Sequence, residues 1–260
     1  MKLEALFGYV LEAEFAACSA AGRIDRYPWG AILLAPEYPL VHEANMAWVD
    51  RLPASGISQV LLELDNVMRA NGISYRDLEF EDPTAAAAVH TNLVNLGYQA
   101  TRAVAMVRLG TAACIRNPDL EIREVDTAEE RDVFDAVLGD LYAESQYGED
   151  VSRELIARIR ERTPKLRERL FLGLFGGVGA GIASLIPREK LALFDEVGTR
   201  PKFRRRGAAR TLVDEVSNRA QAMGLPYVGL VTGWDNEPAR ALYTSLGYTA
   251  VGEIRGFHKA

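Results

Sequence analysis

Hydrophobic and polar positions in the first half of the chain follow two periods, which predict helices and strands in turn. Spacing and composition typical of helices predict three of them: residues 1–21, 57–70 and 83–95. Short apolar or alternating runs predict four strands: residues 30–35, 42–49, 74–80 and 98–109. Gly22 and Pro28 mark a segment that we interpret as a loop, and residues 110–118 are interpreted as a linker.

The second half begins with a predicted strand at residues 120–125. Helical spacing then predicts four helices, the last of them capped by its first residue: 128–143, 152–162, 209–223 and 236–246. Apolar runs predict five more strands: residues 170–175, 178–186, 190–199, 227–232 and 248–257. The run 227–232 is apolar without alternation, which is typical of a strand covered on both faces.

Two short motifs occur at corresponding places in both halves. A Gly ends a helix before a strand in two segments: Asn71-Gly72-Ile73 and Met223-Gly224-Leu225. A Leu-Gly-Tyr triplet does the same later in each half: Leu96-Gly97-Tyr98 and Leu246-Gly247-Tyr248. We interpret this recurrence as a tandem repeat of α/β domains, with the first domain at residues 1–110 and the second at residues 119–260.

Composition and charge narrow the classes of function. The 260 residues are 48% hydrophobic and 25% charged, which is ordinary for a globular protein. A net charge of -6 argues against nucleic acid as a partner. The two cysteines and three histidines show neither the spacing of a disulfide framework nor that of a metal site. We therefore expect no metal, and a reducing cytoplasm is the default location.

Two apolar segments could be mistaken for membrane-directed ones. Glu4, Glu12 and Glu14 interrupt the N-terminal segment, whereas a signal peptide needs an unbroken apolar run. Residues 170–187 carry no charge, but five glycines among them favour a buried hairpin that turns at Gly176-Gly177. No membrane is therefore expected as a partner.

A basic segment between a strand and a helix of the second half contrasts with the acidic composition. Residues 200–210 hold six cations and no acid: Arg200, Lys202, Arg204, Arg205, Arg206 and Arg210. The helix then starts at Gly207-Ala208-Ala209, where small side chains let an anion approach the backbone. Free N–H groups and the helix dipole favour an anion there, so we interpret the segment as a pyrophosphate cradle.

The spacing Arg204-x-x-Gly207-x-Ala209 resembles the acetyl-CoA signature of the GCN5-related N-acetyltransferases, the GNAT superfamily. Residues 236–248 resemble a second segment of that superfamily, Asn-x-x-Ala-x-x-Leu-Tyr-x-x-x-Gly-Phe/Tyr. The resemblance implies two GNAT-like domains, each with a mixed, mostly antiparallel central sheet flanked by helices. It also implies a degenerate first copy, because residues 51–56 lack the cradle pattern.

The resemblance implies acetyl-CoA as co-substrate and gives roles to particular residues. Backbone groups of Val197, Gly198 and Thr199 would hold the pantetheine arm and polarise the thioester. The segment after them would bind the pyrophosphate: Arg204, Arg205, Arg206, Gly207, Ala208 and Ala209. Tyr243 would donate a proton to the departing CoA sulfur, and Asn236 would contact the cofactor arm while capping its helix.

The base that deprotonates the amine is a hypothesis drawn from strand position. Glu196 lies beside the thioester site, and strand alternation predicts that Asp195 points to the opposite face. The alternative for Glu196 is an exposed carboxylate at a strand end. Protein N-terminal acetyltransferases of the superfamily tend to carry a glutamate where this chain has Val231, which disfavours that class of acceptor.

These interpretations predict an N-acetyltransferase that moves acetyl to a primary amine of a small molecule by direct attack, because neither cysteine lies near the motifs. Acids and aromatics near the site are candidate acceptor contacts: Tyr142, Glu144, Tyr147, Glu149, Asp150 and Trp234. Two alternatives stay open, a non-catalytic acyl-CoA-binding regulatory protein and a protein N-terminal or lysine acetyltransferase. The sequence is also compatible with a homodimer.

Overall fold

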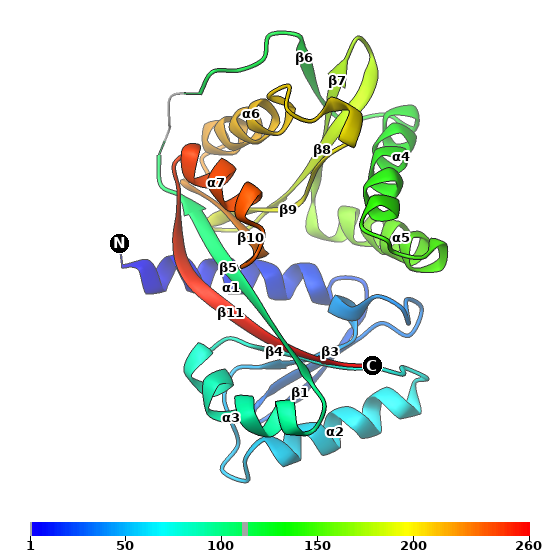
Figure 1. Cartoon of the computed structure of the whole chain (residues 1–260), viewed down its shortest axis with the longest axis vertical. Coiled ribbons are helices and arrows are strands. Elements are labelled where there is room, and N and C mark those ends of the chain that lie inside the picture. Colours follow the sequence, from blue (N-terminus) through cyan, green and yellow to red (C-terminus); the bar gives the residue numbers. More distant parts are fainter. Residues whose placement is uncertain (1, 111–113) are drawn as a thin grey trace.

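The strands of both halves form a single mixed sheet in the computed structural model, which describes residues 2–110 and 114–260 (Figure 1). The helices of the described residues are α1 Leu3–Ser19, α2 Ile57–Ala70, α3 Pro83–Asn95, α4 Ala128–Glu144, α5 Glu149–Leu166, α6 Ala208–Ala222 and α7 Glu237–Ser245, with short 3-10 helices η1 His42–Ala44 and η2 Pro201–Phe203. The strands are β1 Arg23–Tyr27, β2 Gly30–Leu34, β3 Met46–Val49, β4 Arg76–Phe80, β5 Gln99–Arg108, β6 Leu120–Glu124, β7 Arg169–Phe175, β8 Val178–Pro187, β9 Leu191–Thr199, β10 Tyr227–Gly233 and β11 Tyr248–Lys259.

The two halves exchange their last strands. The order in the sheet is β1-β2-β3-β4-β11-β5-β10-β9-β8-β7-β6. The last strand of the second half, β11, lies between β4 and β5, with Phe257 opposite Leu78. The last strand of the first half, β5, lies between β11 and β10, with Val107 opposite Gly229. Each half therefore supplies backbone hydrogen bonds that the other half's sheet needs.

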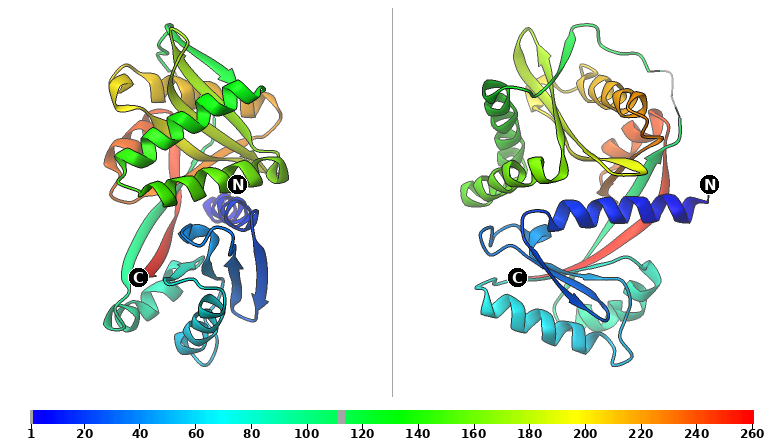
Figure 2. Two further views of the ribbon diagram at one scale, coloured as in Figure 1. Left: turned by 90° about the vertical axis from the view of Figure 1, so that its right-hand side faces the viewer. Right: turned by 180° about the vertical axis from the view of Figure 1, so that it is seen from behind.

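One helix covers the centre of the sheet across both halves. Figure 2 shows α1 running across the sheet between the helices of the two halves. Leu6 and Val10 pack with Leu191 of β9, and Leu11 packs with Trp48 of β3. α6 and α7 cover the opposite face of the central strands, and α2 and α3 pack on the first half. The central strands are thus covered on both faces along the buried part of β5, from Val104 to Arg108.

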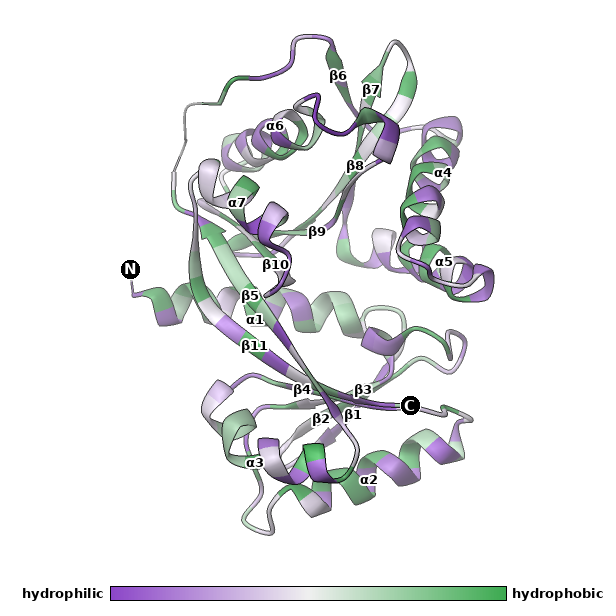
Figure 3. Cartoon of the chain, in the orientation of Figure 1, coloured by the Kyte–Doolittle hydropathy of each residue, from purple (hydrophilic) through white to green (hydrophobic). Residues whose placement is uncertain are grey.

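The strand β5 changes character along its length. Its first residues are exposed and its last ones are buried, and Figure 3 shows the matching change from hydrophilic to hydrophobic residues. In the buried part Val104 and Met106 face α6 and α7, whereas Ala105 and Val107 face α1. This alternation fits a strand whose two faces both meet hydrophobic layers.

Most elements agree with the sequence predictions, and the α/β class with a mostly antiparallel sheet is confirmed. The helices predicted at 57–70 and 83–95 have those bounds in the structure. Asp82 caps the second of them by accepting a hydrogen bond from the Thr84 N–H. Among the described residues, none of the helices combines the length and apolar character needed to cross a membrane.

Two predictions in the first half were wrong. The segment between Gly22 and Pro28 contains an edge strand, β1, rather than a loop alone. Its mixed polar sequence carries a weak strand signal because most of it is exposed. Residues 42–44 form η1, so only Met46–Val49 of the predicted strand pairs with its neighbours. The predicted linker 110–118 lies partly outside the described residues, and the division into domains stays a prediction.

A buried ion pair fixes β5 to α6. The Arg108 guanidinium is 0% exposed and the Asp214 carboxylate 3%, and Arg108 Nη2 donates to Asp214 Oδ1 over 2.9 Å. Arg116 donates to the other carboxylate oxygen over 2.8 Å. Removing the acid would leave a guanidinium inside the protein without its counter-charge, which is far costlier than losing an exposed pair.

We expect Asp214→Ala to lower the free energy of unfolding by about 3 to 5 kcal/mol. The matched control is Asp150→Ala, because Asp150 and Arg153 form an ion pair in which both side chains are about three quarters exposed. That control should cost less than about 1 kcal/mol. Urea unfolding followed by circular dichroism measures both values. Equal losses in the two variants would contradict the structural role of the buried pair.

Candidate acetyl-CoA and acceptor site

The site begins where two parallel strands separate. β9 and β10 pair from Tyr227 opposite Leu191 to Leu230 opposite Phe194, and no further. Beyond that point β9 stays paired with β8 and β10 stays paired with β5. A cavity of about 500 Å³ lies beside the part of β9 that β10 has left. It is lined by residues of β9, the cradle, α4 and α7, among them Tyr142, Glu196, Val197, Gly198, Thr199, Arg204, Ala209, Asn236 and Tyr243.

A β-bulge in β9 positions the two acids of this strand. Ala183 pairs with Val197 and Leu185 with Phe194, so two residues of β9 lie opposite Ser184 alone. The hydroxyl of Ser184 accepts a hydrogen bond of 3.1 Å from the backbone N–H of Glu196. Strict alternation does not hold at a bulge, and the prediction that Asp195 points to the opposite face from Glu196 was wrong. Both side chains bond helices that pack on one face of the sheet, α5 and α4.

The partners of the two acids differ. The phenol of Tyr142, on α4, donates to the Glu196 carboxylate over 3.1 Å. Asp195 forms an ion pair with Arg162 of α5, a buried guanidinium that also donates to Glu168 over 3.0 Å. Glu196 is thus half-buried and faces the cavity, whereas the charge of Asp195 is compensated by an arginine.

Burial sets the protonation of the cavity groups. Desolvation and, second, the charge of Asp195 raise the pKa of Glu196 to about 8, against the opposing effect of Arg162. Tyr243, which is 7% exposed, has a pKa raised to about 12 by burial. A carboxyl with a pKa near neutrality and a phenol that stays protonated are suited to act as general base and general acid.

The cradle forms a second cavity, of about 490 Å³, at the start of α6. Gly207 precedes the helix with φ +75°, a left-handed conformation that strongly favours glycine. The cavity is lined by Thr199, Arg204, Arg205, Gly207, Ala208, Ala209 and Arg210 and by residues of α7. The free N–H groups of the first turn of α6 therefore lie beside arginines, as an anion site requires.

Two arginines of the cradle have other partners in this structure. Arg204 forms two hydrogen bonds with the Glu144 carboxylate, one of them 2.6 Å long, and its Nε donates to the Thr199 carbonyl over 3.0 Å. Arg206 lies over the Phe175 ring, 4.1 Å from its centre, and lines neither cavity. Arg204 is therefore the arginine that connects the two cavities.

Of the candidate acceptor contacts, Tyr142, Glu144 and Tyr147 line the larger cavity. Glu149 and Asp150 begin α5 outside it. Trp234 also lies outside, with the Arg102 guanidinium 3.3 Å from the centre of one of its rings.

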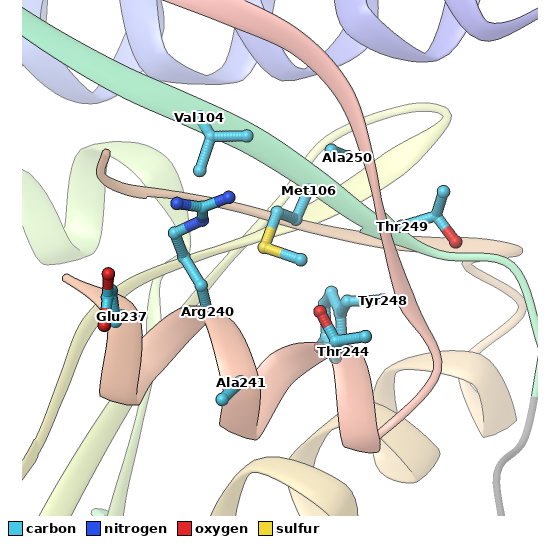
Figure 4. A pocket seen from close by; sticks show the side chains of 9 residues that line it. All are labelled: Val104, Met106, Glu237, Arg240, Ala241, Thr244, Tyr248, Thr249 and Ala250. Atoms are coloured by element: carbon cyan, nitrogen blue, oxygen red, sulfur yellow. The ribbon is translucent and has the colours of Figure 1, made fainter. Parts of the chain in front are cut away.

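A third cavity, of about 480 Å³, lies on the other side of α7 (Figure 4). Val104 and Met106 of β5 line it together with Arg240 and Thr244 of α7. None of the residues to which a catalytic or cofactor-binding role was given lines this cavity. Asn236 and Tyr243 instead face the larger cavity, and the Asn236 side chain accepts a hydrogen bond of 3.3 Å from the Ala239 N–H.

The model of the acetyltransferase (GNAT) family matches residues 135–248, which span the bulged strand, the cradle and α7. Residues 135–248 therefore belong to the acetyltransferase (GNAT) family. The resemblance inferred from the two motifs is thereby confirmed, and the family's chemistry makes this half an acyltransferase. No curated protein sequence matches the chain.

Solved structures with the same fold cover nearly the whole chain, including the first half. A GNAT protein from Kribbella flavida shares 17% identity, covers 96% of this chain and 94% of its own, and has a TM-score of 0.72. A functionally unknown conserved protein from Staphylococcus epidermidis shares 17% identity, covers 92% of this chain and 94% of its own, and has a TM-score of 0.73. A tandem GNAT protein from the clavulanic acid biosynthesis pathway shares 12% identity, covers 100% of this chain and 96% of its own, and has a TM-score of 0.57.

The motifs did not reveal all the groups around the GNAT site. The bond from Tyr142 to Glu196 and the pair of Arg162 with Asp195 join residues far apart in the sequence. The only signal in the sequence was the unusual pair of acids inside an otherwise apolar strand, Leu191 to Thr199. Buried acids need partners, but the partners cannot be identified from the sequence pattern.

Proposed function

We propose that this GNAT enzyme transfers acetyl from acetyl-CoA to a primary amine of a small molecule by direct attack. The observation that carries the proposal is the cavity beside the unpaired part of β9, which contains Glu196 and Tyr243 and adjoins the cradle at Thr199. An extended thioester ligand with a diphosphate fits a gap that ends at a helix N-terminus beside arginines.

The backbone of β9 supports binding of the pantetheine arm. Val197, Gly198 and Thr199 pair with β8 on one edge, and the other edge has no strand partner. Peptide groups on that edge are available to hydrogen-bond an extended chain and to polarise a thioester carbonyl. Arg204, Arg205 and Arg210, which line the second cavity, and the first turn of α6 would bind the phosphates.

The reaction moves two protons, and the cavity offers one group to accept a proton and another to donate one. Glu196, directly or through a water molecule, would accept the proton of the attacking amine. Tyr243 would donate its phenol proton to the sulfur as the carbon–sulfur bond breaks. Tyr142, which bonds Glu196, lines the cavity together with Tyr147 and Glu144. These aromatic and acidic side chains favour a small cationic amine as acceptor.

Cofactor binding is tested by calorimetric titration with acetyl-CoA. The variant with Arg204→Ala and Gly207→Glu should bind about 100-fold more weakly than wild type, because it loses a guanidinium and places a carboxylate in the cradle. Arg206→Ala is the matched control, since this arginine lies over Phe175 and not in the cavities, and it should bind within about threefold of wild type. Absence of binding to the wild-type protein would refute the cradle.

Turnover should depend on the protonation of Glu196. We expect kcat/KM to rise with pH and to level off above a midpoint near 8, because only the deprotonated carboxylate accepts a proton. Glu196→Gln should lower kcat/KM about 100-fold and remove this dependence. The measurement is a pH profile of amine acetylation. An unchanged profile in Glu196→Gln would assign the base to another group.

The acid role is tested by Tyr243→Phe, which should lower kcat about 100-fold while leaving the affinity for acetyl-CoA unchanged. Tyr248→Phe is the control, because the Tyr248 hydroxyl bonds Ser217 over 2.8 Å and lies outside the larger cavity. Steady-state kinetics together with acetyl-CoA titration give both quantities. Binding of acetyl-CoA without turnover of any amine would favour a non-catalytic acyl-CoA-binding protein.

A further inference from the structure

Two of the three histidines, assigned no role from the sequence, meet at one carboxylate. Nδ1 of His42, in η1, lies 2.7 Å from Asp77 Oδ2, and Nδ1 of His258, in β11, lies 2.6 Å from Asp77 Oδ1. His258 and Asp77 are direct neighbours across the β4–β11 pair. The strand exchange therefore brings together ligand-type side chains from three separate segments.

The donor set is that of a transition-metal site. One atom from each of the three side chains can be chosen so that all lie within 4.8 Å of one another. Imidazole nitrogen and carboxylate oxygen are ligands that zinc takes in tetrahedral sites, with water completing the coordination. The Asp77 side chain is mostly buried, whereas His42 and His258 are partly exposed, so an ion and its water have access from solvent.

A neighbouring aromatic ring holds one of the three side chains in place. The His42 ring stacks on Tyr75, with ring centres 3.8 Å apart. Stacking restricts the orientation of the imidazole, which reduces the entropy lost when a ligand is fixed.

We propose that His42, Asp77 and His258 bind one divalent transition-metal ion, with zinc as the ion that this donor set fits best. The ion would fasten β11, the last strand of the second half, to β4 and η1 of the first half. The site is separate from the acetyltransferase cavities, since none of its three residues lines them. The proposal therefore stands independently of the proposed reaction.

The test is calorimetric titration of the full chain with zinc chloride, after removal of any affinity tag and treatment with a chelator. A Cys114→Ser background removes a partly exposed thiol that could compete for the ion. We expect one zinc per chain and a rise in Tm of about 5 °C or more at saturating zinc. Magnesium, which prefers all-oxygen sites, should produce neither effect.

Variants locate the ion. His42→Ala, His258→Ala and Asp77→Asn should each weaken zinc binding more than about 100-fold and remove the Tm rise. His90→Ala is the matched control, because the third histidine lies exposed on α3 and should bind zinc as wild type does. Circular dichroism verifies that each variant is folded. If the histidine variants do not fold, Asp77→Asn still tests the site, because asparagine has nearly the same shape as aspartate. No zinc binding by wild type, or binding that survives all three substitutions, would overturn the proposal.

Discussion

The exchange of β5 and β11 between the halves is the constraint on which the rest of the structure depends. β10 pairs with β5 along the whole run from Val228 to Gly233, but with β9 only as far as Leu230. β10 therefore follows the direction set by a strand of the other half and leaves β9. The free edge of β9 beside the cavity exists because hydrogen bonds with β5 hold β10 after those with β9 have ended.

The first half shows what the same arrangement looks like without a gap. β3 and β4 are also a parallel pair, and α2, like α6, begins after a glycine with positive φ, Gly56 at +78°. Here the pairing continues to the last residue of each strand, Val49 and Phe80, and the Glu81 N–H extends it to the Val49 carbonyl. No opening is left between these strands for an extended ligand. The degenerate origin of this half stays a prediction.

Electrostatic differences within the site come from position rather than residue type. Asp195 and Glu196 are adjacent acids, yet one is neutralised by the buried Arg162 and the other meets only a phenol. The bulge opposite Ser184 and the packing of α4 beside α5 create this difference. The Asp195 carboxylate therefore has a structural role in an ion pair, whereas the Glu196 carboxylate is available for proton transfer.

The sequence determined the elements and the cofactor motifs, because both depend on local pattern. Helical periodicity predicted the bounds of α2 and α3. The spacing from Arg204 to Ala209 predicted an anion site at a helix start, and the structure has a cavity lined by arginines at that place. Position on the strand also suggested Glu196. Local pattern could not give the exposed strand β1, since its residues are polar and its pairing with β2 is what makes it a strand.

Only the tertiary structure decided which distant groups meet. The strand exchange joins two sheets into one, brings Arg108 to Asp214, and places His258 beside Asp77 and His42. Each of these contacts depends on a pairing between segments more than a hundred residues apart, and such pairing is set by the packing of whole elements. Periodicity reports the environment of a residue, buried or exposed, but does not identify the partner that creates it.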